Sequence, residues 1–228
     1  MEIHFLDQFD YTFTADDIMD QLGMPRDHVF RKTVEKVLAE AECVAKPKAF
    51  YMESKIQERT VDSITIGGQT FHSTALVKNL EGQDTVFPFL CTCGRELLEF
   101  GEGLTDLMEQ YAFDCIMEFY LRKASVALTG ALANMEDGRQ TSSVNPGSLV
   151  DWPIEEQKEL FALFGDNASL IGVELSDSCI MHPMKSVSGI RYFTEEEFHN
   201  CQLCQRSKCP TREADFDLEL YTKTLKQC

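Results

Sequence analysis

A long helical pattern between Leu104 and about Met135 is the feature that most constrains the fold. This segment contains no proline, and its apolar residues recur at intervals of three and four positions, which places them on one face of a helix. The pattern predicts a helix of about 30 residues, which at 1.5 Å per residue would be roughly 45 Å long. We expect a helix of this length to be the spine against which the other elements pack.

Two short runs rich in β-branched and aromatic residues, 63–66 and 69–72, flank Gly67 and Gly68. A Gly-Gly pair favours a tight hairpin turn, because both central residues of a type I′ turn need positive φ. Further strands are expected at 50–52, 85–93, 169–175 and 187–193. Because Pro88 cannot donate a ladder hydrogen bond, its strand is expected at a sheet edge or at a bulge.

Shorter helices are predicted from capping and periodicity. Thr14 and Asp17 form an N-cap pattern, and Gly23 is a signal that ends a helix. Further helices are expected at 27–44, 154–164 and 215–226, and a polar loop is expected at 136–151. Since helices and β-rich segments are segregated along the chain, the predicted class is α+β around an antiparallel sheet.

The composition excludes several classes of partner. The net charge of −17 is opposite in sign to the surface that a nucleic-acid backbone selects, so no nucleic-acid partner is expected. Partners should be neutral or cationic, or should carry a basic patch. The chain starts with no basic and apolar leader, and it has no run of about 18 apolar residues, so we expect a soluble, cytoplasmic protein that does not bind membranes.

Three cysteines crowd together near the C-terminus. Cys201, Cys204 and Cys209 follow the spacing C-x2-C-x4-C and precede a proline, within a cysteine-rich segment at 199–212. The chain has nine cysteines and no secretion signal, which favours reduced thiols and metal ligands over disulfides. Thiolates are soft ligands that suit zinc or an iron–sulfur cluster; the alternative is a loop of exposed, reduced cysteines. Candidate fourth ligands are Cys179, His199, Cys228 and the pair Cys91 and Cys93.

A turn after a predicted strand carries a lysine among small residues. Lys185, Ser186, Ser188 and Gly189 could receive an anion or the polar edge of a ligand. The equally weighted alternative is an ordinary connection between two strands.

Two other groups have a structural interpretation that we favour. Asp114, Glu118 and Arg122 lie four positions apart on the long helix, which is typical of a solvated, ion-paired face rather than of a proton-transfer site. Cys91 and Cys93 lie on the same side of a predicted strand and are expected to be small core residues. No nucleotide-phosphate motif and no catalytic triad is present, so no residue is assigned a catalytic role.

Several stretches, taken in their order, resemble one known family. They are Asn145-Pro-Gly, Asp151-Trp-Pro-Ile, Pro183-Met-Lys-Ser-Val-Ser-Gly and the C-x2-C-x4-C-P run. Together they are similar to the activation domain of cobalamin-dependent methionine synthase, and more narrowly to its stand-alone relatives. The resemblance extends upstream through Phe89-Leu-Cys-Thr-Cys-Gly to the long helix, so it covers most of the chain.

The resemblance implies a single domain over residues 1–228, with a twisted antiparallel sheet and flanking helices. In the family, this domain binds S-adenosylmethionine, covers the cobalamin of a partner module, and supports reductive remethylation of cobalamin from its inactive cobalt(II) state. The implied partner is a corrinoid protein or a cobalamin-dependent methyltransferase module. The expected cofactor-binding residues are Pro146, Gly147, Lys185, Ser186, Ser188 and Gly189, and the expected metal ligands are Cys201, Cys204, Cys209 and Cys179.

The sequence departs from the family at the adenosylmethionine motif. Ser143 and Ser148 stand where the family has an arginine and a tyrosine, whereas the Pro-Gly pair between them matches. Loss of the arginine's contact with a carboxylate, worth roughly 1.5–3 kcal/mol, would weaken binding about ten- to a hundredfold. Binding of S-adenosylmethionine, and methyl transfer from it, are therefore doubtful.

Three functions remain open. The first is a corrinoid-handling accessory protein that binds cobalamin, or a module carrying it, and supports its loading or reductive reactivation. The second is a reductive activation subunit that binds S-adenosylmethionine and relays electrons through an iron–sulfur cluster. The third is an interaction domain in which zinc only holds the C-terminal segment in place.

Overall fold

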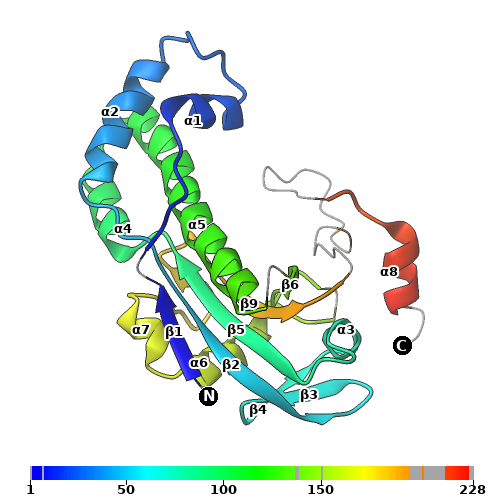
Figure 1. Ribbon diagram of the computed structural model, residues 1–228. Coiled ribbons are helices and arrows are strands. Elements are labelled where there is room, and N and C mark those ends of the chain that lie inside the picture. Colours follow the sequence, from blue (N-terminus) through cyan, green and yellow to red (C-terminus); the bar gives the residue numbers. More distant parts are fainter. Residues whose placement is uncertain are drawn as a thin grey trace.

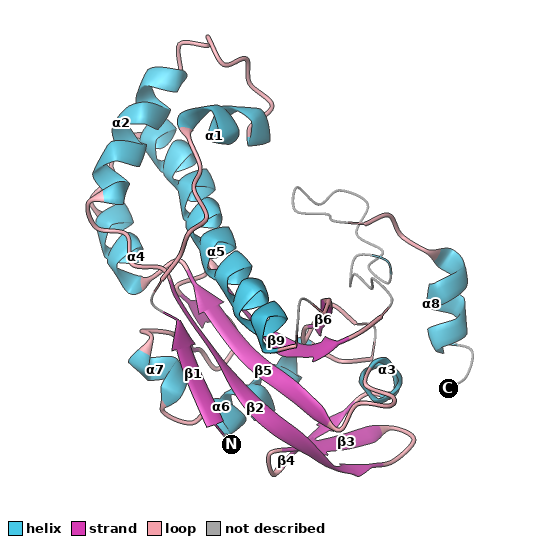
Figure 2. Ribbon diagram, viewed as in Figure 1, coloured by secondary structure: helices cyan, strands magenta, loops and turns pink. Residues whose placement is uncertain are grey.

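The computed structural model describes residues 2–6, 8–136, 139–149, 151–195, 202 and 214–225. The helices are α1 (Ala15–Gln21), α2 (Arg31–Glu42), α3 (Thr74–Asn79), α4 (Arg95–Glu102), α5 (Leu107–Met135), the short 3-10 helix η1 (Ile154–Glu156), α6 (Gln157–Phe164), α7 (Asn167–Leu170) and α8 (Leu218–Leu225). The strands are β1 (Glu2–Leu6), β2 (Lys48–Arg59), β3 (Ser63–Ile66), β4 (Gln69–His72), β5 (Thr85–Thr92), β6 (Thr141–Val144), β7 (Glu174–Leu175), β8 (Met181–His182) and β9 (Ser186–Phe193). The sheet forms the base, and α1, α2 and the first half of α5 stand above it (Figure 2), which confirms the predicted α+β class.

The main sheet is antiparallel throughout. Its order is β4-β3-β2-β5-β9-β6, and β1 pairs with the first half of β2 while β3 pairs with the second half. β7 and β8 form a separate two-stranded sheet. The predicted hairpin is confirmed: β3 and β4 are joined by Gly67 and Gly68, whose φ angles are 58° and 89°. These positive values are what the glycine pair predicted.

Helix α5 is the predicted long helix and connects the two parts of the molecule (Figure 1). Asp106 caps it by accepting hydrogen bonds from the backbone N–H groups of Met108 (2.8 Å) and Glu109 (3.0 Å). Its first half buries residues such as Phe113 and Ile116 against α1, α2 and α4. Its second half packs Leu128 and its neighbours on the sheet. No helix in the described part of the chain is long and apolar enough to cross a membrane.

A second core lies on the other face of the sheet. Trp152, Phe50, Phe71 and Phe164 are among the largest side chains that are completely enclosed there. Phe164 of α6 meets Phe50 of β2 edge to face, with ring centroids 5.1 Å apart, and Trp152 meets Phe71 in the same way at 6.0 Å. The sheet is therefore covered by α5 on one face and by α3 and α6 on the other, as a two-sided sheet needs.

The N-terminus of α1 has the capping box that the sequence predicts. The Thr14 hydroxyl accepts from the backbone N–H of Asp17, and the Asp17 carboxylate accepts from the backbone N–H of Thr14 at 2.7 Å. These contacts with Thr14 hold the pKa of Asp17 below its usual range. Gly23 follows the helix with a φ of 65°.

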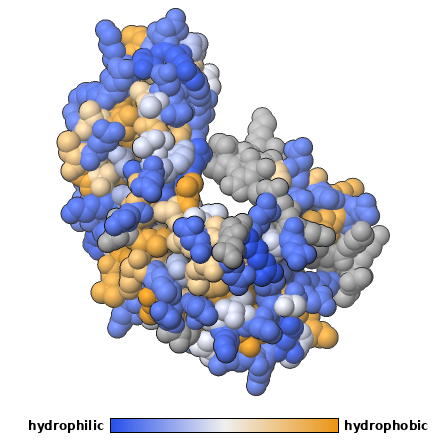
Figure 3. All heavy atoms as spheres, viewed as in Figure 1, coloured by the Kyte–Doolittle hydropathy of each residue, from blue (hydrophilic) through white to orange (hydrophobic). Residues whose placement is uncertain are grey.

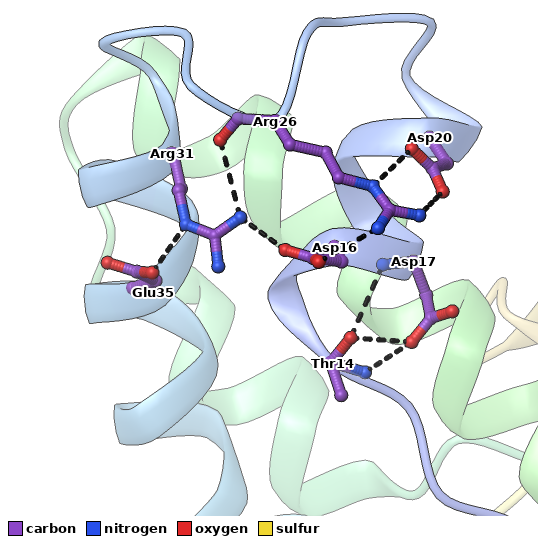
Figure 4. Close-up of polar contacts among 7 residues, drawn as sticks. All are labelled: Thr14, Asp16, Asp17, Asp20, Arg26, Arg31 and Glu35. Carbon is purple, nitrogen blue, oxygen red and sulfur yellow. Dashed lines mark hydrogen bonds and ion pairs between the residues drawn. The ribbon is translucent and has the colours of Figure 1, made fainter.

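Charged side chains join α1 to α2 across the intervening loop (Figure 4). Arg26 lies between Asp16 and Asp20, with nitrogen to oxygen distances of 3.1 Å to Asp16 and 3.1 Å from its Nε to Asp20. Arg31, at the start of α2, contacts Asp16 and also Glu35, the latter at 2.7 Å. Because all of these groups are at the surface, they orient the two helices and add little to the free energy of folding.

The expectation for Pro88 was wrong. Its strand, β5, lies in the middle of the sheet between β2 and β9 rather than at an edge. The β5 ladder toward β2 is interrupted beside the proline, since Tyr51 pairs with Phe89 and the next pair is Ser54 with Val86. The register is the same on both sides of this gap, so no bulge forms. Pro88, which has no N–H, thus lies at a position of β5 that has no pairing partner in β2.

Two further expectations were wrong in part. The expected polar loop at 136–151 contains strand β6, and the expected strand at 169–175 begins with the end of α7 and a turn, with only Glu174–Leu175 forming a strand. Both errors have one cause: short segments without clear periodicity take the structure that their tertiary neighbours allow. The expected helices at 27–44, 154–164 and 215–226 are present, although the first and last begin later, at Arg31 and Leu218.

Asp151 links the core on the second face of the sheet to helix α3 through hydrogen bonds. Its carboxylate accepts hydrogen bonds from the Ser73 hydroxyl (2.9 Å) and from the backbone N–H of Ala75 (3.0 Å). Ser73 is the N-cap of α3 and accepts in turn from the backbone N–H of Leu76 at 2.9 Å. A carboxylate at a helix N-terminus also interacts favourably with the helix dipole.

We therefore expect Asp151→Asn to lower the free energy of unfolding by about 1–2 kcal/mol, because an amide oxygen accepts fewer and weaker bonds than a carboxylate. Urea unfolding followed by circular dichroism measures the change. The matched control is Asp166→Asn, since Asp166 is exposed at the start of α7 and makes no capping hydrogen bond with its side chain. Equal midpoints for the two variants would show that the Asp151 cap adds no stability.

Candidate functional site

The Pro-Gly pair singled out in the sequence forms a rigid turn directly after β6. The backbone N–H of Ser148 donates to the carbonyl of Asn145 at 3.0 Å, and Gly147 has a φ of 80°, the positive value that a type II turn needs after Pro146. The N–H of Gly147 donates to the carbonyl of Trp152 at 2.8 Å, which ties the turn to the core. Gly147 is exposed, so a ligand can approach its backbone closely.

The predicted residues Ser188 and Gly189 lie against this turn. The Asn145 side-chain amide donates to the carbonyl of Ser188 at 2.7 Å, and the Gln157 amide donates to the hydroxyl of Ser188 at 2.9 Å. A Cβ atom on Gly189 would lie 2.4 Å from the carbonyl oxygen of Val144. Glycine is therefore required here so that β6 can approach β9, and four of the predicted cofactor residues are brought together.

The other two predicted residues, Lys185 and Ser186, are separate from that group. The Lys185 ammonium lies 2.9 Å from Asp114 and 3.8 Å from Glu118, both on α5. The Ser186 hydroxyl is buried and donates to the carbonyl of Pro183 at 2.7 Å. It lies on the same face of the sheet as Ser188, but it contacts Thr92 and the segment before β9 rather than the turn after β6. Asp114 and Glu118 on α5 are thus ion-paired, as expected, but their partner is Lys185, whereas Arg122 donates to the Gln21 side chain at 3.0 Å.

Arg191 is a residue that the sequence interpretation missed. It lies directly opposite Ser143 in the β6–β9 ladder, and its side chain points to the face that α5 covers. Its guanidinium lies 5.3 Å from the centroid of the Phe89 ring and donates to the Thr141 hydroxyl at 3.1 Å. The available signal was its place two residues after Gly189 in a predicted strand, which puts both on one face.

A second guanidinium lies near the same edge of the sheet. Arg139 is placed over the ring of Phe193 at 5.5 Å, and it pairs with Glu136 at 2.8 Å. Phe193 is two residues beyond Arg191 on β9, so both arginines approach the same face near the C-terminal end of α5. Because Arg139 is paired with Glu136, Arg191 is the guanidinium of this face that we consider as a partner for an anionic group.

Cys91 and Cys93 are buried core residues, as expected. Burial raises the pKa of each thiol to about 12. Since the thiolate is the form that binds metals and reacts, both side chains are inert, neutral thiols at neutral pH.

The predicted metal cluster cannot be placed. Cys201, Cys204 and Cys209 lie outside the described residues, as do His199 and Cys228. Cys179 is described: it is buried, with a φ of 62°, in the turn between β7 and β8. Within the described ranges, no three His, Cys, Asp or Glu side chains are grouped as metal ligands. The metal site, and Cys179 as its fourth ligand, therefore stay predictions.

The close approach of β6 and β9 leads to a test of the turn. Gly189→Ala should lower the free energy of unfolding by about 2 kcal/mol or more, because the new methyl group must displace β6 and break the Asn145–Ser188 bond. Gly130→Ala is the control: Gly130 lies in exposed helix, and a Cβ there meets nothing within 4 Å. The control should be more stable than wild type by about 0.5–1 kcal/mol, and thermal unfolding measures both. A stabilising effect of Gly189→Ala would contradict the contact.

Structural comparison finds the same fold in a protein of known structure. The chain is similar to the crystal structure of the MetH reactivation domain bound to AdoHcy, with a TM-score of 0.58 and 12% sequence identity, over 87% of this chain and 80% of that one. No protein-family model matches the sequence, and no curated protein is significantly similar to it. The chain therefore has a fold like that of the MetH reactivation domain, as the sequence resemblance predicted.

Proposed function

We propose that this chain is a reactivation module for a cobalamin-dependent methyltransferase: it docks on the module that carries the corrinoid and supports its return to the active state. The observation that carries the proposal is the fold shared with the MetH reactivation domain over 87% of the chain. Because one fold can host many functions, the proposal also needs support from a site. That support comes from the edge formed by β6 and β9.

The β6–β9 edge offers a place for an adenosyl ligand with an amino-acid carboxylate. The MetH reactivation domain, whose fold is similar, has a crystal structure with bound AdoHcy, a ligand of this class. Ser143 replaces the expected arginine, but Arg191 lies opposite it and supplies a guanidinium on the same face. Arginine suits a carboxylate because its planar fork can donate two parallel hydrogen bonds. We infer that Arg191 takes over the role of the missing residue.

The residues of the edge would then bind and orient the ligand. Arg191 would hold the carboxylate, while Gly147, exposed and without a side chain, lets the ligand lie close to the turn. The contact of Arg191 with Thr141 limits the freedom of the guanidinium before the ligand arrives. S-adenosylmethionine, when bound, supplies a methyl group.

Docking is favoured by charge. The chain carries a net charge of −17, and the part of the molecule that contains α1 and α2 has a largely hydrophilic surface (Figure 3). A partner with a basic face would be attracted to such a surface, and the attraction would weaken with added salt. An iron–sulfur cluster or zinc at the cysteine-rich segment stays a prediction, which iron and zinc analysis of anaerobically purified protein tests.

The proposed docking is tested with a corrinoid methyltransferase module loaded with cob(II)alamin. Adding the chain should change the absorbance spectrum of the bound corrinoid, because covering the cofactor changes the environment and ligation of the cobalt. Binding should weaken as the salt concentration rises. Free cob(II)alamin is the control for contacts that need no partner protein. If neither the loaded module nor the free corrinoid changes its spectrum or co-elutes with the chain, the proposed function is wrong.

The role of Arg191 is tested separately by calorimetry with AdoHcy. We expect Arg191→Gln to weaken binding about ten- to a hundredfold, since a charge-assisted contact is lost. Ser143→Arg in that background should restore part of the affinity by returning a guanidinium to the neighbouring strand. Arg95→Gln is the matched control, because Arg95 forms surface ion pairs with Glu99 and Glu174 and does not belong to the β6–β9 edge. Unchanged affinity in Arg191→Gln would remove Arg191 from the site without affecting the docking proposal.

A further inference from the structure

A pocket lies beside α5 near the segment that leads from β1 to α1, whose course Figure 1 shows. It has a volume of about 510 Å³ and is open to solvent, within the range of small-molecule sites. Its walls also come from the end of α2 and from the connection between α2 and β2. The residues around it are Phe9, Thr12, Phe13, Glu42, Ala45, Pro47, Tyr120 and Lys123. None of them belongs to the β6–β9 edge.

Aromatic rings form adjoining walls of this pocket. Phe13 and Tyr120 meet at 84°, with centroids 5.1 Å apart, so their planes form a corner. Phe13 is held from another side by Phe119, which stacks on it at 4.9 Å with an interplanar angle of 22°. Phe9 adds a third ring. Phe119 covers one face of Phe13 and Tyr120 is largely buried, so the pocket is lined by the exposed parts of Phe13 and Phe9 and by the rim of Tyr120. Aromatic faces carry partial negative charge, and they attract methylated cations.

Charges of opposite sign complete the pocket. Glu42 lies beside the hydroxyl end of Tyr120: burial, and secondarily the field of this carboxylate, raises the pKa of Tyr120 to about 12. Lys123 is three residues after Tyr120 on α5 and so lies on the same side of the helix. Neither the Glu42 nor the Lys123 side chain forms an ion pair or hydrogen bond with any residue that the structure describes. Both charges are thus available to a ligand.

We propose that this pocket binds a small zwitterion with a quaternary ammonium head and a carboxylate. A methylated ammonium cannot donate hydrogen bonds, so aromatic faces and a carboxylate such as Glu42 are its natural partners. Lys123 would pair with the ligand's carboxylate and would repel a ligand that carries only positive charge. An uncharged ligand would leave both charges unused. The inference does not depend on the proposed corrinoid function.

Glycine betaine, the smallest such zwitterion, is the probe. Titration followed by nuclear magnetic resonance should show saturable binding to the whole chain. Two analogues separate the contributions: 3,3-dimethylbutanoate has the same shape without the positive charge, and choline keeps the cation without the carboxylate. Each analogue should bind at least about tenfold more weakly than glycine betaine. Absence of betaine binding, or equal binding of betaine and 3,3-dimethylbutanoate, overturns the proposal.

Variants then locate the site. Glu42→Gln and Phe13→Leu should each weaken betaine binding about tenfold, whereas Tyr120→Phe keeps the ring and should retain it. Glu40→Gln is the matched control for Glu42→Gln, because Glu40 is exposed on the same helix and does not line the pocket. Circular dichroism checks that each variant is folded, and the surface change at Glu42 keeps the test usable if Phe13→Leu unfolds. If Glu42→Gln binds betaine as tightly as Glu40→Gln does, the site is not this pocket.

Discussion

The structure depends on helix α5, because its side chains contribute to two separate hydrophobic cores. The first half of α5 buries Phe113 and Ile116 against the helices α1, α2 and α4, and its second half buries Leu128 and Leu132 on the sheet. A helix with a single apolar face could serve only one of these surfaces. Because α5 is 29 residues long, it reaches both, and the helical part keeps a defined position over the sheet. The β6–β9 edge and the pocket lined by Phe13 and Tyr120 both lie beside this helix.

At the β6–β9 edge, the requirements of the fold and of a ligand site coincide. Gly189 has no room for a side chain because the backbone of β6 passes so close, and the same closeness puts Ser143 directly opposite Arg191. The loss of the family arginine from one strand is thus offset, in our proposal, by a guanidinium from the next. A substitution that looks disabling in the sequence can be neutral in space when strands are paired.

The structure brings some of the predicted site residues together and separates others, for identifiable reasons. Pro146 and Gly147 were assigned from the family resemblance, and the structure has them in a tight turn, as a Pro-Gly pair favours. Lys185 was grouped with the same site because it is near in sequence, yet it faces α5 and pairs with Asp114. Lys185 precedes β9, and its long side chain reaches the acidic residues of α5 rather than the turn after β6, so proximity in sequence was misleading there. Arg191 was missed because its importance depends on the strand beside it.

The sequence by itself determined the local elements: the long helix, the capping box at Thr14, the Gly67–Gly68 hairpin and the α+β class. These follow from interactions within a few residues of each other, which composition and spacing record directly. Only the tertiary structure decided that Pro88 lies in a central strand and that the polar segment around Ser143 forms a strand. It also decided that Phe13 and Tyr120 meet at a corner. Each of these depends on a partner far away in the chain, and one sequence does not name such partners.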